Sequence, residues 1–103
     1  MAKTPSMAVI MTRYYRAMVA GLARNKPREA IENLLVCLTA RTTMAEFWCL
    51  LGDVFLASER GDMAKEFYRN AVDFGKGRDF GDPWPVQLSK YKDYPEAKLA
   101  SLA

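Results

Sequence analysis

Hydrophobic positions recur every three or four residues along much of this chain, and the pattern is clearest from residue 45 to residue 74. Two groups of residues lie at this helical spacing, Trp48, Leu51, Gly52 and Phe55 in the first and Ala64, Tyr68 and Ala71 in the second. The break between them at Gly61-Asp62 predicts a tight turn. We therefore expect antiparallel helices at about 45–59 and 62–74, with Asp62 as the N-cap of the second and Gly75 as its stop signal.

A weaker form of the same pattern precedes this hairpin. Asn25-Lys26-Pro27 predicts a turn, and Pro27 suits the first position of a helix. The sequence therefore predicts helices at about 6–24 and 27–39. A shift of 34 residues places Ala30, Leu34 and Cys37 opposite Ala64, Tyr68 and Ala71, whereas Ala17, Met18 and Gly21 stand in place of Leu51, Gly52 and Phe55. The first hairpin is thus a degenerate copy of the second.

The last quarter of the chain departs from the pattern. Residues 75–85 are rich in Gly, Asp and Pro and are predicted to be irregular, and 86–92 has the composition of a short helix. Asp93-Tyr94-Pro95-Glu96 looks like the start of another helix, which runs to about Leu102. We expect four side chains of this segment to pack over the second hairpin as a cap, namely Trp84, Leu88, Tyr91 and Tyr94. The alternative is an exposed docking motif.

The order of residue types in 45–78 resembles the tetratricopeptide repeat, whose 34-residue pattern is W-x2-L-G-x2-Y, then A-x3-F and a closing Pro. The seven residues that define the second hairpin fall at matching spacings, with Phe55 and Tyr68 as exchanged aromatics. Two departures exist, because Lys76 replaces the closing Pro and the Gly61-Asp62 turn lies about two residues late.

This resemblance implies an all-α fold of antiparallel helical hairpins. The repeats would cover about 11–44 and 45–78, followed by a C-terminal cap at about 79–103. Because 103 residues suffice for one hydrophobic core but not for two, we expect a single domain over 1–103.

In tetratricopeptide-repeat proteins, the first helix of each repeat lines a concave surface that holds a peptide. Carried onto this sequence, the lining is Thr12, Tyr15, Val19 and Leu22 from the first repeat and Cys49, Asp53 and Leu56 from the second. We expect Cys49 to be accessible there, and Phe55 to be buried in the repeat's own packing. An equally weighted alternative is that Tyr15, Val19 and Leu22 line no groove, because the tail or a second copy of the chain buries them. Cys49 and Asp53 stand where the carboxylate-clamp variant of the family needs basic or amide groups.

Charge is unevenly distributed. The net charge is +3, but residues 1–28 hold six Lys or Arg residues and no acid. A basic patch of Arg13, Arg16 and Arg24 could meet acidic peptide, phospholipid or nucleic acid, although only this stretch suggests nucleic acid. A solvated basic face is the simpler alternative. An organellar transit peptide would also be Arg-rich, but this stretch supplies the first helix of a repeat.

The sequence contains few of the residues that catalytic sites require. The chain has no His, and Cys37 and Cys49 match no zinc motif, so we expect no catalytic triad, metal site or cofactor. No apolar run approaches the roughly 20 residues that span a bilayer, and we expect a cytoplasmic protein with reduced thiols.

The sequence favours a non-enzymatic adaptor or scaffold that binds a peptide or helix of another polypeptide. One alternative is a small chaperone of the secretion type that holds an aggregation-prone subunit. Another is a self-associating structural module. A homodimer is expected, because solenoids usually need about three repeats to bury a continuous core and this chain has two.

Overall fold

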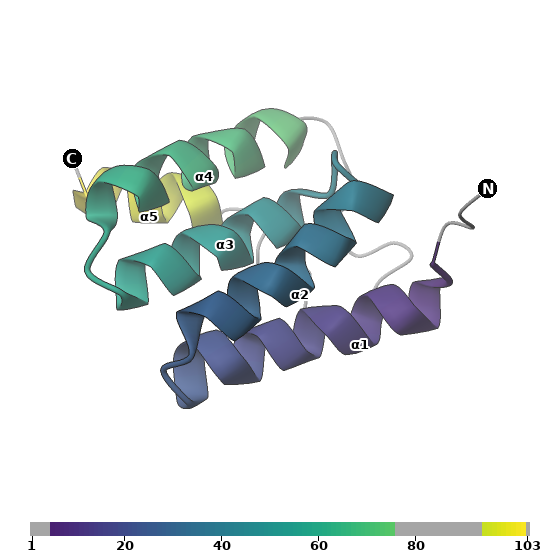
Figure 1. Cartoon of the computed structure of the whole chain (residues 1–103). Coiled ribbons are helices and arrows are strands. Elements are labelled where there is room, and N and C mark those ends of the chain that lie inside the picture. The colour runs from purple at the N-terminus through teal and green to yellow at the C-terminus, as the bar shows by residue number, and fades with distance from the viewer. Residues whose placement is uncertain (1–4, 76–93, 103) are drawn as a thin grey trace.

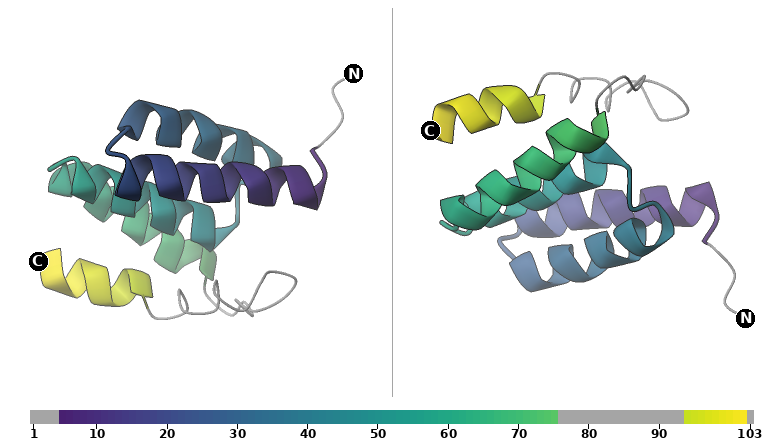
Figure 2. Two further views of the ribbon diagram at one scale, coloured as in Figure 1. Left: turned by 90° about the horizontal axis from the view of Figure 1, so that it is seen from below. Right: turned by 90° about the horizontal axis from the view of Figure 1, so that it is seen from above.

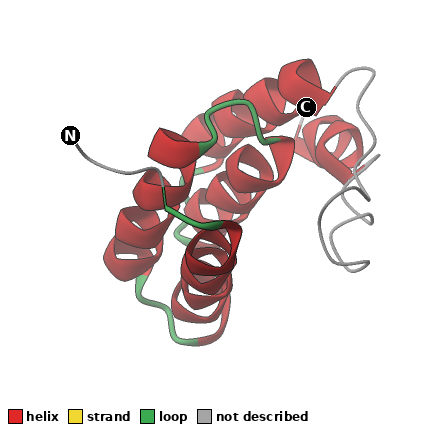
Figure 3. Cartoon of the chain, turned by 90° about the vertical axis from the view of Figure 1, so that its right-hand side faces the viewer, coloured by secondary structure: helices red, strands yellow, loops and turns green. Residues whose placement is uncertain are grey.

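The computed structural model describes residues 5–75 and 94–102, and every regular element in these ranges is helical (Figures 1 and 3). The helices are α1 (Met7–Met18), continued by a π-helical turn (Val19–Ala23), α2 (Pro27–Ala40), α3 (Ala45–Ala57), α4 (Gly61–Gly75) and α5 (Tyr94–Leu102). The prediction of an all-α fold is therefore confirmed. Each predicted helix up to residue 75 matches an observed one to within about two residues at its ends, once the π-helical turn is counted with α1.

The helices form successive antiparallel pairs. In Figure 1, α1 and α3 run in one direction and α2 and α4 in the other, so that α2 and α4 begin at the same end of the molecule. In both views of Figure 2, α5 lies beside α4 and on the far side of it from α2. Within the described residues, none of these helices combines the length and the hydropathy that crossing a bilayer requires.

A register change occurs at the end of α1. The backbone N–H of Arg24 donates to the carbonyl of Val19 over 2.9 Å, a five-residue step that inserts one extra residue into the turn. The shift places Gly21 against the neighbouring helices. A Cβ at Gly21 would stand 2.6 Å from Cγ2 of Val54 and 3.0 Å from Cβ of Ala30. Only glycine permits this approach.

The core draws on all of the first four helices. Its largest fully buried hydrophobic side chains are Tyr14, Tyr68, Phe47, Ile10, Leu34, Leu50 and Val54. Leu51, Gly52, Ala64 and Ala71 are buried with them, as the repeat pattern predicts. Phe55 is an exception. It is only half-buried, which corrects the prediction that it belongs to the buried set, because it lies on the side of α3 that α2 and α4 leave partly open.

The turn between α3 and α4 differs in detail from the prediction. The left-handed residue is Glu59, at φ 62°, and α4 begins at Gly61. Asp62 therefore lies in the first turn of α4 and is not its N-cap, although a carboxylate there still suits the positive end of the helix dipole. At the other predicted turn, Asn25 takes the left-handed conformation and Pro27 opens α2, as expected.

The C-terminal helix α5 confirms the prediction of a helix from about Tyr94 to Leu102. Its Tyr94 ring packs edge-on against Tyr68, with ring centroids 6.4 Å apart, and Pro95 is buried. The predicted contact of Tyr94 with the second hairpin is thus present. The expectations for residues 76–93, including Trp84, Leu88 and Tyr91, lie outside the described residues.

Candidate functional site

The exposed side of α1 forms a hollowed strip, which we call the α1 outer face and define by Val9, Thr12, Tyr15, Arg16, Val19 and Arg24. Two hollows lie along it, one of about 520 Å³ bordered by Tyr15, Val19 and Arg24, and one of about 310 Å³ bordered by Val9. Thr12 and Arg16 border both hollows, so the strip is continuous.

Hydrophobic side chains on this face are open to solvent. Val9 is 46% exposed and Val19 is 48% exposed. They are two of the four large hydrophobic residues that stand out as exposed among the described residues, the others being Leu22 and Leu35. Isolated exposed valines are unremarkable, but two on one strip beside arginines form a surface suited to an amphipathic partner.

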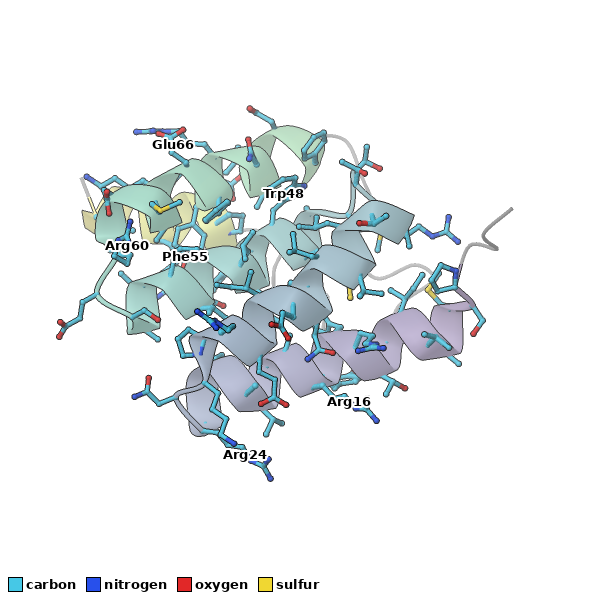
Figure 4. The ribbon with its side chains drawn as sticks, viewed as in Figure 1. Arg16, Arg24, Trp48, Phe55, Arg60 and Glu66 are labelled. Atoms are coloured by element: carbon cyan, nitrogen blue, oxygen red, sulfur yellow. The ribbon has the colours of Figure 1, made fainter. Side chains whose placement is uncertain are left out.

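The predicted basic patch is split by the structure. Arg16 and Arg24 are exposed and project from the lower edge of the molecule in Figure 4. Arg13 is half-buried instead, because its Nη1 donates to Oδ1 of Asn33 over 3.1 Å. Asn33 in turn donates to the carbonyl of Glu29. Arg13 therefore ties α1 to α2 and borders only the smaller hollow, and the exposed cations of the outer face are Arg16 and Arg24.

The second half of the predicted lining lies elsewhere. Leu22, Asp53 and Leu56 border a separate hollow of about 260 Å³, which Tyr94 and Lys98 of α5 also border. The structure thus brings together Leu22 with Leu56, and Tyr15 with Val19, but in two hollows. Sequence reasoning did not assign Lys98 to this surface, since its place depends on where α5 packs.

Asp53 links α5 to α3 and α4. The hydroxyl of Tyr68 donates to Oδ1 of Asp53 over 2.5 Å, and the hydroxyl of Tyr94 donates to the same oxygen over 2.9 Å. Asp53 is 9% exposed. A carboxylate held by two hydroxyl donors joins α3, α4 and α5, so Asp53 is engaged within the fold and offers little surface to a ligand.

The prediction that Cys49 is accessible is wrong. Its side chain is 1% exposed, and burial raises the pKa of the thiol, as do the nearby carboxylates of Asp53 and Glu46. Tyr94 of α5 donates to Asp53, one turn along α3 from Cys49, so α5 lies near this side of α3. The local pattern placed Cys49 and Asp53 on one side of the helix, but both are buried in the fold.

Cys37 is buried, as predicted, at the crossing of α1 and α2. Its Sγ donates to the carbonyl of Ile10 over 3.4 Å. Burial raises the pKa of Cys37 to about 11, although the positive charge of Arg13 opposes the shift. Both thiols are therefore held in the unreactive, protonated form at neutral pH.

Both thiols should accordingly be protected, Cys49 at least as strongly as Cys37. We expect native protein at pH 8 to react with Ellman's reagent at least about a hundredfold more slowly than protein unfolded in urea, because a rise of the pKa from 9.0 to about 11 lowers the thiolate fraction by that factor. Cys37→Ala and Cys49→Ala variants let each thiol be timed alone. If Cys49 in the folded protein reacted as fast as it does in protein unfolded by urea, that result would contradict its burial.

Among the described residues, no three His, Cys, Asp or Glu side chains lie close enough together to hold a metal ion. No protein-family model matches the chain, and the searches of curated proteins and of solved structures return no similar protein. Function is therefore argued from the surface itself.

Proposed function

We propose that this helical domain is a non-enzymatic binding module, which holds an acidic, amphipathic segment of another polypeptide along the α1 outer face. The observation that carries the proposal is the exposure of Val9 and Val19 on one continuous hollowed strip that also presents Arg16 and Arg24. The resemblance to tetratricopeptide repeats supports binding of a polypeptide in general. It would favour one groove lined by both first helices, but Asp53 and Leu56 border a separate hollow with Tyr94 and Lys98 of α5.

The dimensions of the strip suit a peptide. From Val9 to Arg24 it follows 16 residues, or about 24 Å at 1.5 Å per residue. A partner helix of about 16 residues, or about seven residues of extended chain, would cover that length. An amphipathic helix can lay apolar residues at every third or fourth position against Val9, Tyr15 and Val19.

Charge selects the partner's polar residues. Arg16 and Arg24 are exposed, and the one acidic residue that borders the larger hollow is Glu29. Acidic residues beside the partner's apolar stripe would meet these guanidinium groups at the rim. Rim charges mainly set the association rate and the choice of partner, whereas the buried apolar contacts slow dissociation.

The test uses two dye-labelled 16-residue amphipathic peptides with identical Leu stripes, one with Glu and one with Lys on the flanks. We expect the Glu peptide to bind about tenfold more tightly in fluorescence anisotropy, and Arg16→Glu/Arg24→Glu to abolish that preference. Val19→Asp should weaken binding of the Glu peptide by about tenfold or more, because the substitution places a carboxylate in the apolar contact. Arg41→Glu, which changes an exposed arginine at the end of α2, is the matched control.

Three results would overturn the proposal. The first is equal affinity of the unchanged protein for the two peptides. The second is a loss of the preference in Arg41→Glu as large as that in Arg16→Glu/Arg24→Glu, because the attraction would then be non-specific. The third is a stable dimer in sedimentation equilibrium that dissociates in Val19→Asp. The α1 outer face would then bind a second copy of this chain.

A further inference from the structure

A row of aromatic rings occupies a different face, between α2 and α4. Trp48 and Phe55 of α3 alternate with Phe67 and Phe74 of α4, and all four are half-buried. Ring centroids are 4.9 Å apart for Phe55 and Phe67, 6.2 Å for Trp48 and Phe67, and 5.9 Å for Trp48 and Phe74. Figure 4 shows Trp48 and Phe55 between the ribbons of α3 and α4. The rings form one continuous apolar floor, partly open to solvent.

The row ends in a pocket of about 310 Å³ at the end of the molecule where α2 and α4 begin. Its lining is Pro27, Arg28, Ile31 and Glu32 of α2, Val54, Phe55 and Ser58 of α3 and the following turn, and Arg60. Ile31, Val54 and Phe55 supply an apolar interior. This volume lies at the lower limit of small-ligand sites, which run from about 300 to 1,000 Å³.

Two guanidinium groups border the pocket, against one carboxylate, that of Glu32. Within the described residues Arg28 has no hydrogen bond or ion pair. Arg60 has its Nε 3.9 Å from Asp62, where both side chains are more than half exposed, so that pair is weak. Both arginines can turn toward an anion at the mouth of the pocket without breaking a buried contact.

The two ends of the row differ. At the other end, the indole Nε1 of Trp48 already donates to the carbonyl of Thr42 over 2.7 Å, so its ring presents an apolar face and no free donor. A ligand that matches this surface has an apolar body at least as large as one ring and a single negative charge at one end. We propose that the pocket binds a small aromatic or aliphatic monocarboxylate, with its carboxylate held by Arg28 and Arg60 and its apolar body on Ile31 and Phe55.

Three isosteric probes test the charge requirement: 4-phenylbutanoate, 4-phenylbutanol and 4-phenylbutylamine, each titrated into the full chain and followed by amide chemical shifts. We expect the carboxylate to bind with a Kd of about 1 mM, at least about fivefold more tightly than the alcohol, and the amine to be weakest. The shifted amides should be those of Arg28, Ile31, Phe55 and Ser58.

Arg28→Ala/Arg60→Ala should make the carboxylate and the alcohol bind equally, while the alcohol's own Kd stays unchanged. Arg16→Ala/Arg24→Ala is the matched control, and it separates this site from the α1 outer face. Equal binding of the three probes by unchanged protein, or preserved preference in Arg28→Ala/Arg60→Ala, would overturn the proposal. A further probe is an apolar tetrapeptide with a free C-terminal carboxylate. If it bound more than about tenfold more tightly than 4-phenylbutanoate, the proposal would also be overturned, because the pocket would then be a site for a polypeptide terminus.

Discussion

Replacing Gly52 by Val is expected to lower the free energy of unfolding by about 2–3 kcal/mol, which is the upper part of the range for overpacking a core. A Cβ at Gly52 would stand 2.7 Å from Cε1 and 2.8 Å from Cδ1 of the Tyr68 ring. That ring is fully buried, and its hydroxyl is held by Asp53, so it has little freedom to move aside. The two methyl groups of Val add to a contact that is already too close for one carbon.

Gly61→Ala is the control for this prediction. An added Cβ at Gly61, the first residue of α4, meets nothing within 4 Å, and Ala has less conformational freedom to lose on folding than Gly. Urea unfolding followed by circular dichroism should therefore show Gly61→Ala at least as stable as the unchanged protein. For a chain of this length, the loss in Gly52→Val corresponds to a melting temperature lower by roughly 10 °C or more. Unchanged stability of Gly52→Val would mean that α3 and α4 are not packed this closely.

A second large effect is expected at alkaline pH, where we predict that the protein loses stability above about pH 9. Burial raises the pKa of Cys37 to about 11 and raises the pKa of Cys49 further. Burial, followed by the hydrogen bond to Asp53 and the charge of that carboxylate, likewise raises the pKa of Tyr68 above its ordinary value of 10.0. Each of these groups keeps its proton more tightly in the folded state than in the unfolded state.

The direction follows from proton linkage. Below pH 9 both states hold these protons, and the stabilisation is fully present. As the pH rises past 9 for the thiols and 10 for the tyrosine, the unfolded state releases protons that the folded state retains, so the free energy of unfolding falls. The slope approaches about 1.4 kcal/mol per pH unit for each group between its unfolded and its folded pKa.

Urea midpoints measured from pH 8 to pH 11 check this prediction. Tyr68→Phe is the informative variant, because it removes one titrating group along with its hydrogen bond. We expect it to be less stable at pH 8, by about 1–3 kcal/mol, yet to lose stability less steeply between pH 10 and pH 11. A flat profile for the unchanged protein up to pH 11 would contradict the burial of the three groups.

The contacts behind both predictions also position α5. Asp53 and Tyr68 hold α5 against the second hairpin, and Gly52 lets α4 approach α3 closely enough for the Tyr68 hydroxyl to reach Asp53. The α1 outer face lies apart from this network. Variants of Arg16 and Val19 should therefore report on binding without a large change in stability.

Local sequence determined the helices and their order. The spacing of apolar residues placed α3 and α4, and the Asn25-Lys26-Pro27 turn placed the start of α2. Asp93-Tyr94-Pro95-Glu96 placed α5. These signals act between residues a few positions apart, through helix periodicity, proline geometry and capping, so they can be identified in a single chain without knowledge of its neighbours.

The same local pattern identified part of the surface. The repeat resemblance gave Thr12, Tyr15 and Val19 as groove lining, with burial of Tyr15 and Val19 as the alternative, and the charge pattern gave Arg16 and Arg24 as part of a basic patch. The structure places these five residues together around one hollow. Helix periodicity suffices here because the structure places no other described helix over this side of α1.

Tertiary packing decided the rest. The sequence treated Cys49, Asp53 and Leu56 as the continuation of one groove, but Cys49 and Asp53 are buried and Tyr94 of α5 donates to Asp53. Exposure of a helix face depends on what packs against it. The sequence predicted that Tyr94 packs on the second hairpin but not that it reaches Asp53, because α5 comes from more than 35 positions along the chain and its docking position depends on tertiary contacts. The half-exposed ring of Phe55 has the same explanation, since only the separation of α2 from α4 leaves its side of α3 partly open.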